Sequence, residues 1–201
     1  MVAVEEVTRG KALVRFTELP QALHGEDPCF APPVLAWERY RLSFRRNPYF
    51  EEADALLLLA RRAGRPAGRI AAHVPHEGGE GRFGFWSTID DLGVARALVD
   101  GARDWLEAEH GCRSMTGPWS FEPDDEPGLL VAGFTVAGTT GRPWRPPWEA
   151  RLLEELGFEP AGERATWRLP TSELGPERAT TGEPPGQAGT YADPRLVLEG
   201  I

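Results

Sequence analysis

The densest group of ionisable residues in this 201-residue chain is an acidic run between two prolines. The run Glu122–Pro127 reads EPDDEP, so the prolines hold four carboxyl groups close together in an extended segment. Crowded like charges raise the pKa of one member of such a group, and a carboxylate with a raised pKa can accept a proton from an amine. We predict catalytic roles for Glu122, Asp125 and Glu126. The other candidate bases are Asp124 and Glu149.

Two further interpretations of the acidic run stay open. A solvated acidic loop is the plainest, because runs of like charge commonly form a hydrated surface. The other is an acidic entrance to a binding site, whose negative electrostatic potential attracts a cationic small-molecule substrate such as an amine.

Three residues outside the acidic run are candidates for a substrate pocket: Arg69, Trp119 and Trp148. Arg69 stands in the apolar stretch GRIAA, and a buried guanidinium needs a charged or hydrogen-bonding partner. That partner is either an acid of the 124–126 loop or a ligand carboxylate or phosphate. Trp119 and Trp86 each end a predicted strand, where they line a pocket for an acyl or aromatic group or serve as core aromatics. Trp148 has the same core alternative.

Histidine and cysteine give little support for metal or thiol chemistry. His73 and His76 are three residues apart, but a metal site needs at least one more ligand nearby, so we predict no metal. Cys29 and Cys112 are far apart and are expected to be buried free thiols in a reducing compartment.

The composition sets limits on partners and location. The formal net charge is -9, with Lys11 as the only lysine, which gives no electrostatic footprint for nucleic acid or an anionic membrane. The first residues lack a basic start followed by an apolar run, and no apolar run approaches the roughly 20 residues of a membrane helix. We therefore predict a cytoplasmic protein that uses neither nucleic acid nor membrane, and we keep a homodimer open.

Spacing and turn residues predict the elements that position these side chains. The most strongly patterned is a capped amphipathic helix from Asp90 to Gly111. The other expected helices are a helix beginning at Thr17–Pro20, Val34–Phe44 and Pro146–Gly157. The expected strands are Lys11–Phe16, Leu56–Leu59 paired as a hairpin with Ala67–Val74, then Phe83–Ile89, Cys112–Thr116 and Ala161–Leu169.

A strand-helix-strand unit normally forms a right-handed parallel crossover. The order therefore predicts an α/β fold, a mixed central sheet with helices on both faces. We expect one domain over residues 1–170, followed by a Pro- and Gly-rich, disordered tail over 171–201.

In this order and spacing the sequence resembles the GNAT superfamily of acyl-CoA-dependent N-acyltransferases, and more closely a divergent bacterial GNAT-like group. The resemblance covers about Phe16 to Leu169. The motifs that carry it are Asn47-Pro48-Tyr49-Phe50, Gly68-Arg69-Ile70, Phe83-Gly84-Phe85-Trp86, Gly117-Pro118, Asp125-Glu126-Pro127-Gly128-Leu129-Leu130, Gly133-Phe134, and Pro146-Pro147 followed by Leu152-Leu153-Glu154-Glu155-Leu156-Gly157-Phe158.

The resemblance implies where acetyl-CoA or another acyl-CoA would bind. The strand residues Phe85, Trp86, Ser87 and Thr88 would offer backbone groups to pantetheine. The small residues at the helix start, Gly93, Val94 and Ala95, would meet the pyrophosphate, since free N–H groups at a helix start favour anions.

The sequence departs from the superfamily at two places. Asp90 and Asp91 stand at the helix start, where a carboxylate is a good helix cap. The same carboxylates repel pyrophosphate, because two like unit charges about 4 Å apart cost about 4 kcal/mol at an intermediate dielectric. Where many members carry a Tyr as general acid, this chain has Trp148 and Glu149. We predict an N-acyltransferase that moves an acyl group from acyl-CoA to the amine of a small molecule. The alternative is a non-catalytic GNAT-like binding or accessory protein.

Overall fold

A computed structural model describes residues 1–122, 125–139, 144–162 and 198–200. Most of the predicted tail over 171–201 lies outside these residues, and so does the predicted strand beyond Gly162. Of the described helices, none is long and apolar enough to cross a membrane.

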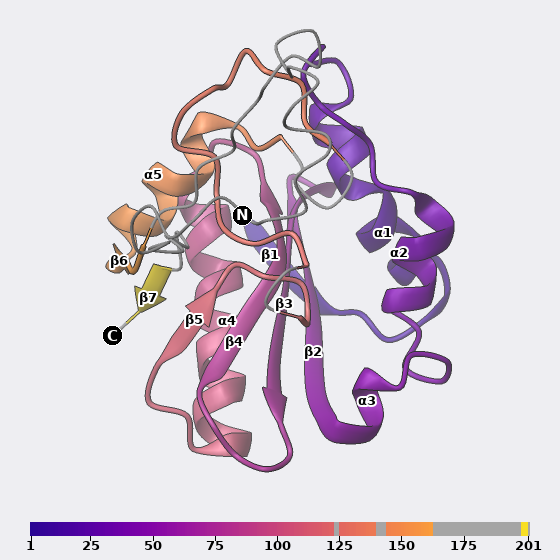
Figure 1. Cartoon of the computed structure of the whole chain (residues 1–201), viewed down its shortest axis with the longest axis vertical. Helices are drawn as coiled ribbons and strands as arrows, with labels where there is room; N and C mark the ends of the chain where they lie inside the picture. The colour runs from indigo at the N-terminus through magenta and orange to yellow at the C-terminus, as the bar shows by residue number, and fades with distance from the viewer. Residues whose placement is uncertain (123–124, 140–143, 163–197, 201) are drawn as a thin grey trace, which may run out of the picture.

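A mixed sheet forms the centre of the molecule (Figure 1). In the described residues it has seven strands in the order β1-β2-β3-β4-β5-β7-β6. β1 to β4 pair antiparallel, β4 and β5 pair parallel, and β7 pairs antiparallel with β5 and β6. The strands are β1 (Val2–Glu6), β2 (Ala53–Arg62), β3 (Arg65–Pro75), β4 (Gly81–Thr88), β5 (Met115–Gly117), β6 (Phe158–Pro160) and β7 (Leu198–Gly200).

The described helices lie on both faces of this sheet and are α1 (Gly10–His24), α2 (Leu35–Arg41), α3 (Tyr49–Glu52), α4 (Leu92–His110) and α5 (Pro147–Glu155). α4 packs on one face with Leu58 and Trp86, while α1 packs on the other with Leu59 and Phe85. Because β2 and β4 are buried on both faces, their sequences are apolar without strict alternation. The predicted fold class, a mixed sheet with helices on both faces, is confirmed.

The prediction of α4 is confirmed together with its boundaries. The Asp91 side chain accepts the N–H of Val94 at 3.0 Å and caps the start. Gly111 ends the helix with a φ of 66°, the left-handed conformation that glycine adopts most easily. Between them, Leu98 and Leu106 belong to the buried face that lies against the sheet.

One predicted element is wrong. Lys11–Phe16 was expected as a strand, but it forms the first part of α1. The apolar residues Phe16, Leu19 and Leu23 continue at helical spacing onto the same core, and this long-range packing outweighs the β-prone character of the short run. Three described strands were not predicted: β1, at the edge of the sheet beside β2, and the short β6 and β7, of which β7 lies in the segment expected to be a disordered tail.

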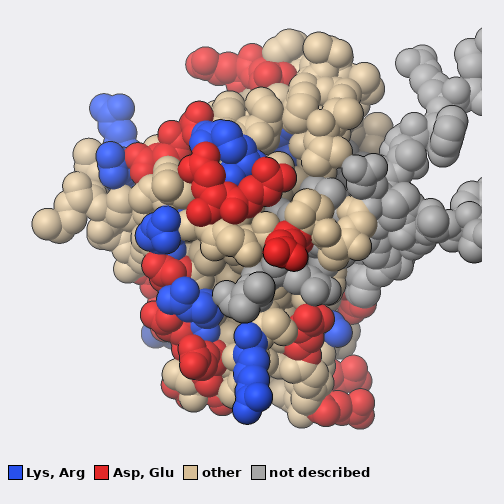
Figure 2. Space-filling view, turned by 90° about the vertical axis from the view of Figure 1, so that its left-hand side faces the viewer, with Lys and Arg blue, Asp and Glu red and all other residues tan. Residues whose placement is uncertain are grey.

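Apart from the predicted strand at Ala161–Leu169, which lies almost wholly outside the described residues, the remaining predicted elements are present with shifted ends. The hairpin is β2 and β3, the aromatic strand is β4, and the second capped helix is α5. β5 pairs with β4 over only two positions, Gly81 with Met115 and Arg82 with Thr116. Beyond Arg82 the outer edge of β4 is therefore free to bond other segments. On the face shown in Figure 2, acidic and basic side chains are interspersed, so charge there is balanced locally.

Candidate functional site

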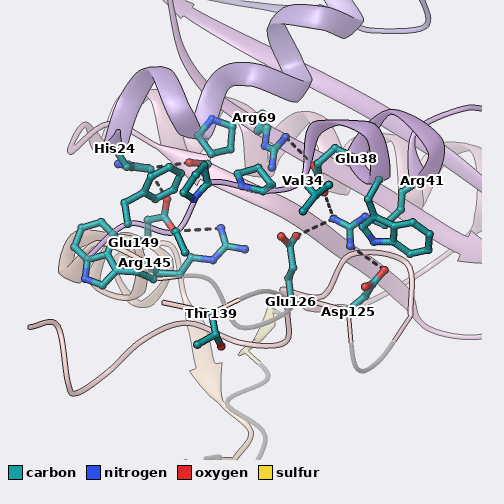
Figure 3. Close-up of a pocket in the computed structure, with 18 residues that line it drawn as sticks. His24, Val34, Glu38, Arg41, Arg69, Asp125, Glu126, Thr139, Arg145 and Glu149 are labelled. Atoms are coloured by element: carbon teal, nitrogen blue, oxygen red, sulfur yellow. Dashed lines mark hydrogen bonds and ion pairs between the residues drawn. The ribbon is translucent and has the colours of Figure 1, made fainter. Parts of the chain in front are cut away.

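A cavity of about 310 Å³ lies between α1, α2, the segment around residues 125–126, Thr139 and the segment 144–149 (Figure 3). This volume is at the lower end of the range for small-molecule pockets. Its buried polar lining comes from α1, α2, β3, β4 and α5 with the segment before it, which are far apart in the sequence. The buried polar residues among the lining are His24, Glu38, Arg41, Arg69, Ser87, Arg145 and Glu149.

Arg41 organises one end of the cavity. Its guanidinium contacts Glu38 on the same helix, lies 2.8 Å from an Asp125 oxygen and 3.2 Å from a Glu126 oxygen. The Arg41 side chain is only 4% exposed, so these carboxylates replace its lost hydration. Although burial would lower the pKa of Arg41, the surrounding acids raise it, and the group remains charged.

The acids around Arg41 differ in their pKa. Burial would raise the pKa of Glu126, but Arg41, Arg145 and Arg69 outweigh it and hold that pKa at about 2; Ser120 also donates to Glu126 at 2.8 Å. Burial and the neighbouring Glu126 raise the pKa of Glu38. Glu126 is therefore a fixed anion near neutral pH and a weak proton acceptor.

Arg69 lies deeper, on β3. It is 2% exposed, donates to the carbonyl of Phe16 at 2.8 Å and lies 3.6 Å from an oxygen of Glu38. Of the loop acids predicted as partners for Arg69, the described Asp125 and Glu126 contact Arg41 instead. Burial lowers the pKa of Arg69 despite this acidic neighbour.

Glu149, near the start of α5, is the most strongly buried carboxyl group of the cavity. It is 0% exposed and accepts the backbone N–H of Thr88 at 3.0 Å. Its second oxygen lies 3.7 Å from Arg145 and has no hydrogen-bond partner among the described residues. Burial raises the pKa of Glu149 to about 7, although Arg145 and the Thr88 N–H oppose the rise.

His24 faces Glu149 from the end of α1 (Figure 3). Its Nε2 lies 2.9 Å from the Ser87 hydroxyl and 3.8 Å from Glu149. Burial, followed by the charge of Arg145, lowers the pKa of His24 to about 4. The imidazole is therefore neutral near pH 7, and Glu149 is the group of this pair that titrates there.

The predicted site residues fall into three groups. Arg69, Ser87, Asp125 and Glu126 line the cavity, whereas Glu122 is exposed and lies outside its lining. Phe85, Trp86, Val94 and Ala95 are core residues that are 0% exposed. Trp119 is 9% exposed, and its carbonyl accepts from His73 at 3.3 Å; Trp148 donates to the Thr88 carbonyl at 2.9 Å.

The segment that the resemblance assigns to acyl-CoA already has partners within the chain. The free edge of β4 is bonded by side chains. The Phe85 N–H donates to the Ser120 hydroxyl oxygen at 3.1 Å, the Thr88 N–H donates to Glu149, and the Thr88 carbonyl accepts from Trp148. At the exposed Gly93, the nearest side chain beyond Asp91 belongs to Arg62. These contacts would have to rearrange for a ligand to use the same backbone groups.

The two acids at the start of α4 are paired. Asp91 lies 3.1 Å from Arg62, and Asp90 contacts Arg151. Their negative charge is therefore offset by two guanidinium groups about half exposed to solvent. An anion approaching this helix start meets basic as well as acidic side chains.

Sequence reasoning missed His24, Glu38, Arg41 and Arg145. The pair Glu38 and Arg41 has the i, i+3 spacing of a surface ion pair, so nothing local shows that both point inward. Of the two histidines considered for metal binding, His73 is buried and bonded to Tyr49 at 2.6 Å. The described residues contain no group of three or more His, Cys, Asp or Glu that could hold a metal ion.

No protein-family model matches the chain. Among curated proteins, it is 32% identical over 185 residues to the bacterial ceramide synthase of Caulobacter vibrioides, across 87% of this chain and 48% of that protein. It is 30% identical over 168 residues to protein YghO of Escherichia coli, across 81% of this chain and 43% of that protein. The chain thus spans about half the length of these relatives.

Solved structures with similar folds are GNAT proteins. A tandem GNAT protein from the clavulanic acid biosynthesis pathway superposes with a TM-score of 0.56 and 17% identity, over 80% of this chain and 45% of that one. A GNAT-family acetyltransferase structure from Desulfovibrio desulfuricans superposes with a TM-score of 0.53 and 12% identity, over 99% and 98% of the two chains. At these identities the likeness is one of fold.

Proposed function

We propose that this chain, which has the GNAT fold, is an N-acyltransferase that moves an acyl group from acyl-CoA to the amine of a small molecule. The observation that carries the proposal is Glu149, a fully buried carboxyl group on the cavity wall whose pKa is raised to about 7. General bases work best when their pKa lies near the working pH. The name of the Caulobacter vibrioides relative, a ceramide synthase, fits amide formation.

In the proposed reaction, Glu149 prepares the amine. An amine that enters as an ammonium ion transfers one proton to the ionised carboxylate, which frees the nitrogen lone pair. Acyl-CoA supplies the acyl group as a thioester: the C–N bond forms as the C–S bond breaks, and the thiolate leaves and takes the second proton from the nitrogen, which gives the amide and free CoA thiol. His24 is neutral near pH 7 and does not compete with the ammonium ion for the Glu149 carboxylate.

The acids around Arg41 have a separate role in this proposal. Asp125 and Glu126 are bound to Arg41, so we assign them to holding the cavity wall and attracting a cationic substrate rather than to proton transfer. Glu122 is exposed and lies outside the cavity lining, so we assign it no part in the reaction. Trp119 and Trp148 position the wall through their hydrogen bonds to neighbouring strands.

For the donor, we propose the start of α4 as the pyrophosphate site. Gly93, Val94 and Ala95 lie in the first turn, where N–H groups favour anions. The guanidinium groups of Arg62 and Arg151 stand beside it and can bind phosphate once they release Asp91 and Asp90. Phe85, Trp86, Ser87 and Thr88 would flank the pantetheine along β4.

The test is release of free thiol from a panel of acyl-CoAs in the presence of amines. We expect Glu149→Gln to lower kcat/KM by 10²- to 10⁴-fold, the usual contribution of a general base. Glu122→Gln is the matched control because that carboxyl group is exposed and outside the cavity, and it should retain activity. In the unaltered protein, kcat/KM should rise with pH and level off above about pH 7.

Thermal shifts with the same acyl-CoAs separate the proposal from a non-catalytic binding protein. Saturation at about 100-fold over Kd stabilises a protein by about 2.7 kcal/mol. A shift without turnover for any amine would favour the binding protein. No shift and no turnover with any acyl-CoA would refute the proposal, as would full activity of the Glu149→Gln variant.

A further inference from the structure

The cavity lining combines buried charged groups with an apolar wall. Glu149, Arg145 and Arg69 are 7% exposed or less and form its inner end, and a second charged group, Arg41 with Glu38, Asp125 and Glu126, lines it beside α2. Apolar side chains from the loop before α2, from α2 itself and from the segment before α5 form the apolar wall: Phe30, Pro32, Pro33, Val34, Trp37 and Trp144. A ligand that matches this lining must itself have a polar and an apolar end.

The apolar side runs from the interior to the surface. Trp144 is 7% exposed and donates its indole N–H to the Phe134 carbonyl at 2.7 Å, so only its ring faces the cavity as a hydrocarbon surface. At the outer end, Val34 and Trp37 are 56% and 53% exposed. Large apolar side chains left in water beside a cavity mark a surface that a ligand can cover.

The opposite rim is fixed to the same loop. The N–H of Gly138 donates to the carbonyl of Cys29 at 2.9 Å, which ties the segment carrying Thr139 to the loop that carries Phe30. Both Phe30 and Thr139 line the cavity. The apolar passage is therefore bounded on two sides by segments held together through their backbones.

We infer that the acceptor is an amine carried on a hydrocarbon chain, with its nitrogen at Glu149 and its chain along Phe30, Val34 and Trp37 toward solvent. The inference rests on the proposed function, because the bound amine is an acceptor only if the protein transfers an acyl group to it. A small polar amine would occupy the inner end and leave the apolar wall hydrated. An alkyl chain removes that wall from water, and each buried methylene strengthens binding.

The same wall could instead take a long acyl chain from the donor, so the experiment has an arm for each source. Calorimetry at pH 8 without any acyl-CoA measures the affinity of ethylamine, hexylamine and decylamine. We expect affinity to rise about fourfold for each added methylene until the wall is covered. Decanoate, which has the same chain but a carboxylate, should bind at least tenfold more weakly than decylamine.

Variants test the location of the chain. Val34→Ser and Trp37→Ser should flatten the dependence on chain length while leaving ethylamine binding unchanged. Leu35→Ser is the matched control, because Leu35 lies on the same helix, is 37% exposed and is not part of the cavity lining. Glu149→Gln should weaken every amine by a similar factor.

Each outcome is decisive. If short and long amines bind equally while thiol release occurs, the inference fails and the proposed function stands. If only the length of the acyl-CoA chain matters, the wall belongs to the donor and the inference is overturned. If amine affinity follows chain length but no acyl-CoA supports turnover, the ligand class is supported and the proposed function fails.

Discussion

The burial of Glu149 makes protein stability depend on pH in a way that one substitution isolates. In the folded chain the pKa of this carboxyl group is raised from 4.5 to about 7. Below pH 4.5 the group is protonated in both the folded and unfolded states. As pH rises toward 7, the unfolded chain loses the proton first, and the free energy of unfolding falls.

The size of this effect follows from the same pKa. The difference between 4.5 and about 7 corresponds to about 3 kcal/mol at 1.36 kcal/mol for each pKa unit. Between pH 5 and pH 8, most of that loss occurs, so we expect about 2 to 3 kcal/mol. Glutamine in place of Glu149 has no proton to lose and keeps an oxygen for the Thr88 N–H, which removes this contribution.

Urea unfolding of the unaltered protein and of Glu149→Gln at pH 5, 6, 7 and 8 measures the contribution directly. The comparison uses the difference between the two proteins at each pH, so that other titrating groups cancel. Relative to the unaltered protein, the variant should gain about 2 to 3 kcal/mol from pH 5 to pH 8. The same difference measured for Glu122→Gln should stay nearly constant.

A pH-independent difference for Glu149→Gln would show that the carboxyl group is ionised in the fold at pH 5 or is not buried. Either result would remove the physical basis for Glu149 as a base near pH 7. A difference that runs in the opposite direction would mean that Arg145 and the Thr88 N–H outweigh burial and lower the pKa instead.

Four further substitutions test the supporting structure. Arg41→Met leaves the acids around it without their cation and should lower the free energy of unfolding in urea by about 3 to 5 kcal/mol. Asp91→Ala should cost about 1 kcal/mol through the lost cap, while the exposed Asp90→Ala should change stability by less than about 0.5 kcal/mol. Gly84→Ala should cost about 3 kcal/mol or more by thermal unfolding, because the new Cβ would lie 1.9 Å from the Trp119 carbonyl oxygen.

Local sequence was sufficient to predict an element where its apolar spacing and its capping residues indicate the same structure. α4 combines an apolar face at helical spacing with the cap at Asp91 and the left-handed glycine at Gly111, so both ends were predictable. Lys11–Phe16 carries residues that suit either strand or helix. Only its packing with Leu59 and Phe85, far along the chain, decides the outcome.

The cavity was harder to predict because its chemistry depends on burial. Glu149 stood among five candidate acids, and sequence alone does not rank them. The pKa of Glu149 follows from complete desolvation, whereas that of Glu126 follows from Arg41, which lies 85 positions away in the sequence. Such contacts arise only when the sheet brings α1, α2 and α5 to one place.

The short pairing between β4 and β5 has a consequence for how the chain opens. Past Phe83, whose carbonyl accepts the Trp119 N–H, the edge of β4 is bonded by side chains from later segments rather than by a strand: Ser120 accepts the Phe85 amide and Glu149 accepts the Thr88 amide. Amide hydrogen exchange at these two positions therefore reports undocking of two different segments, at free energies below that of global unfolding. The exchange rate of the Thr88 amide in particular should report how often α5 undocks from the sheet.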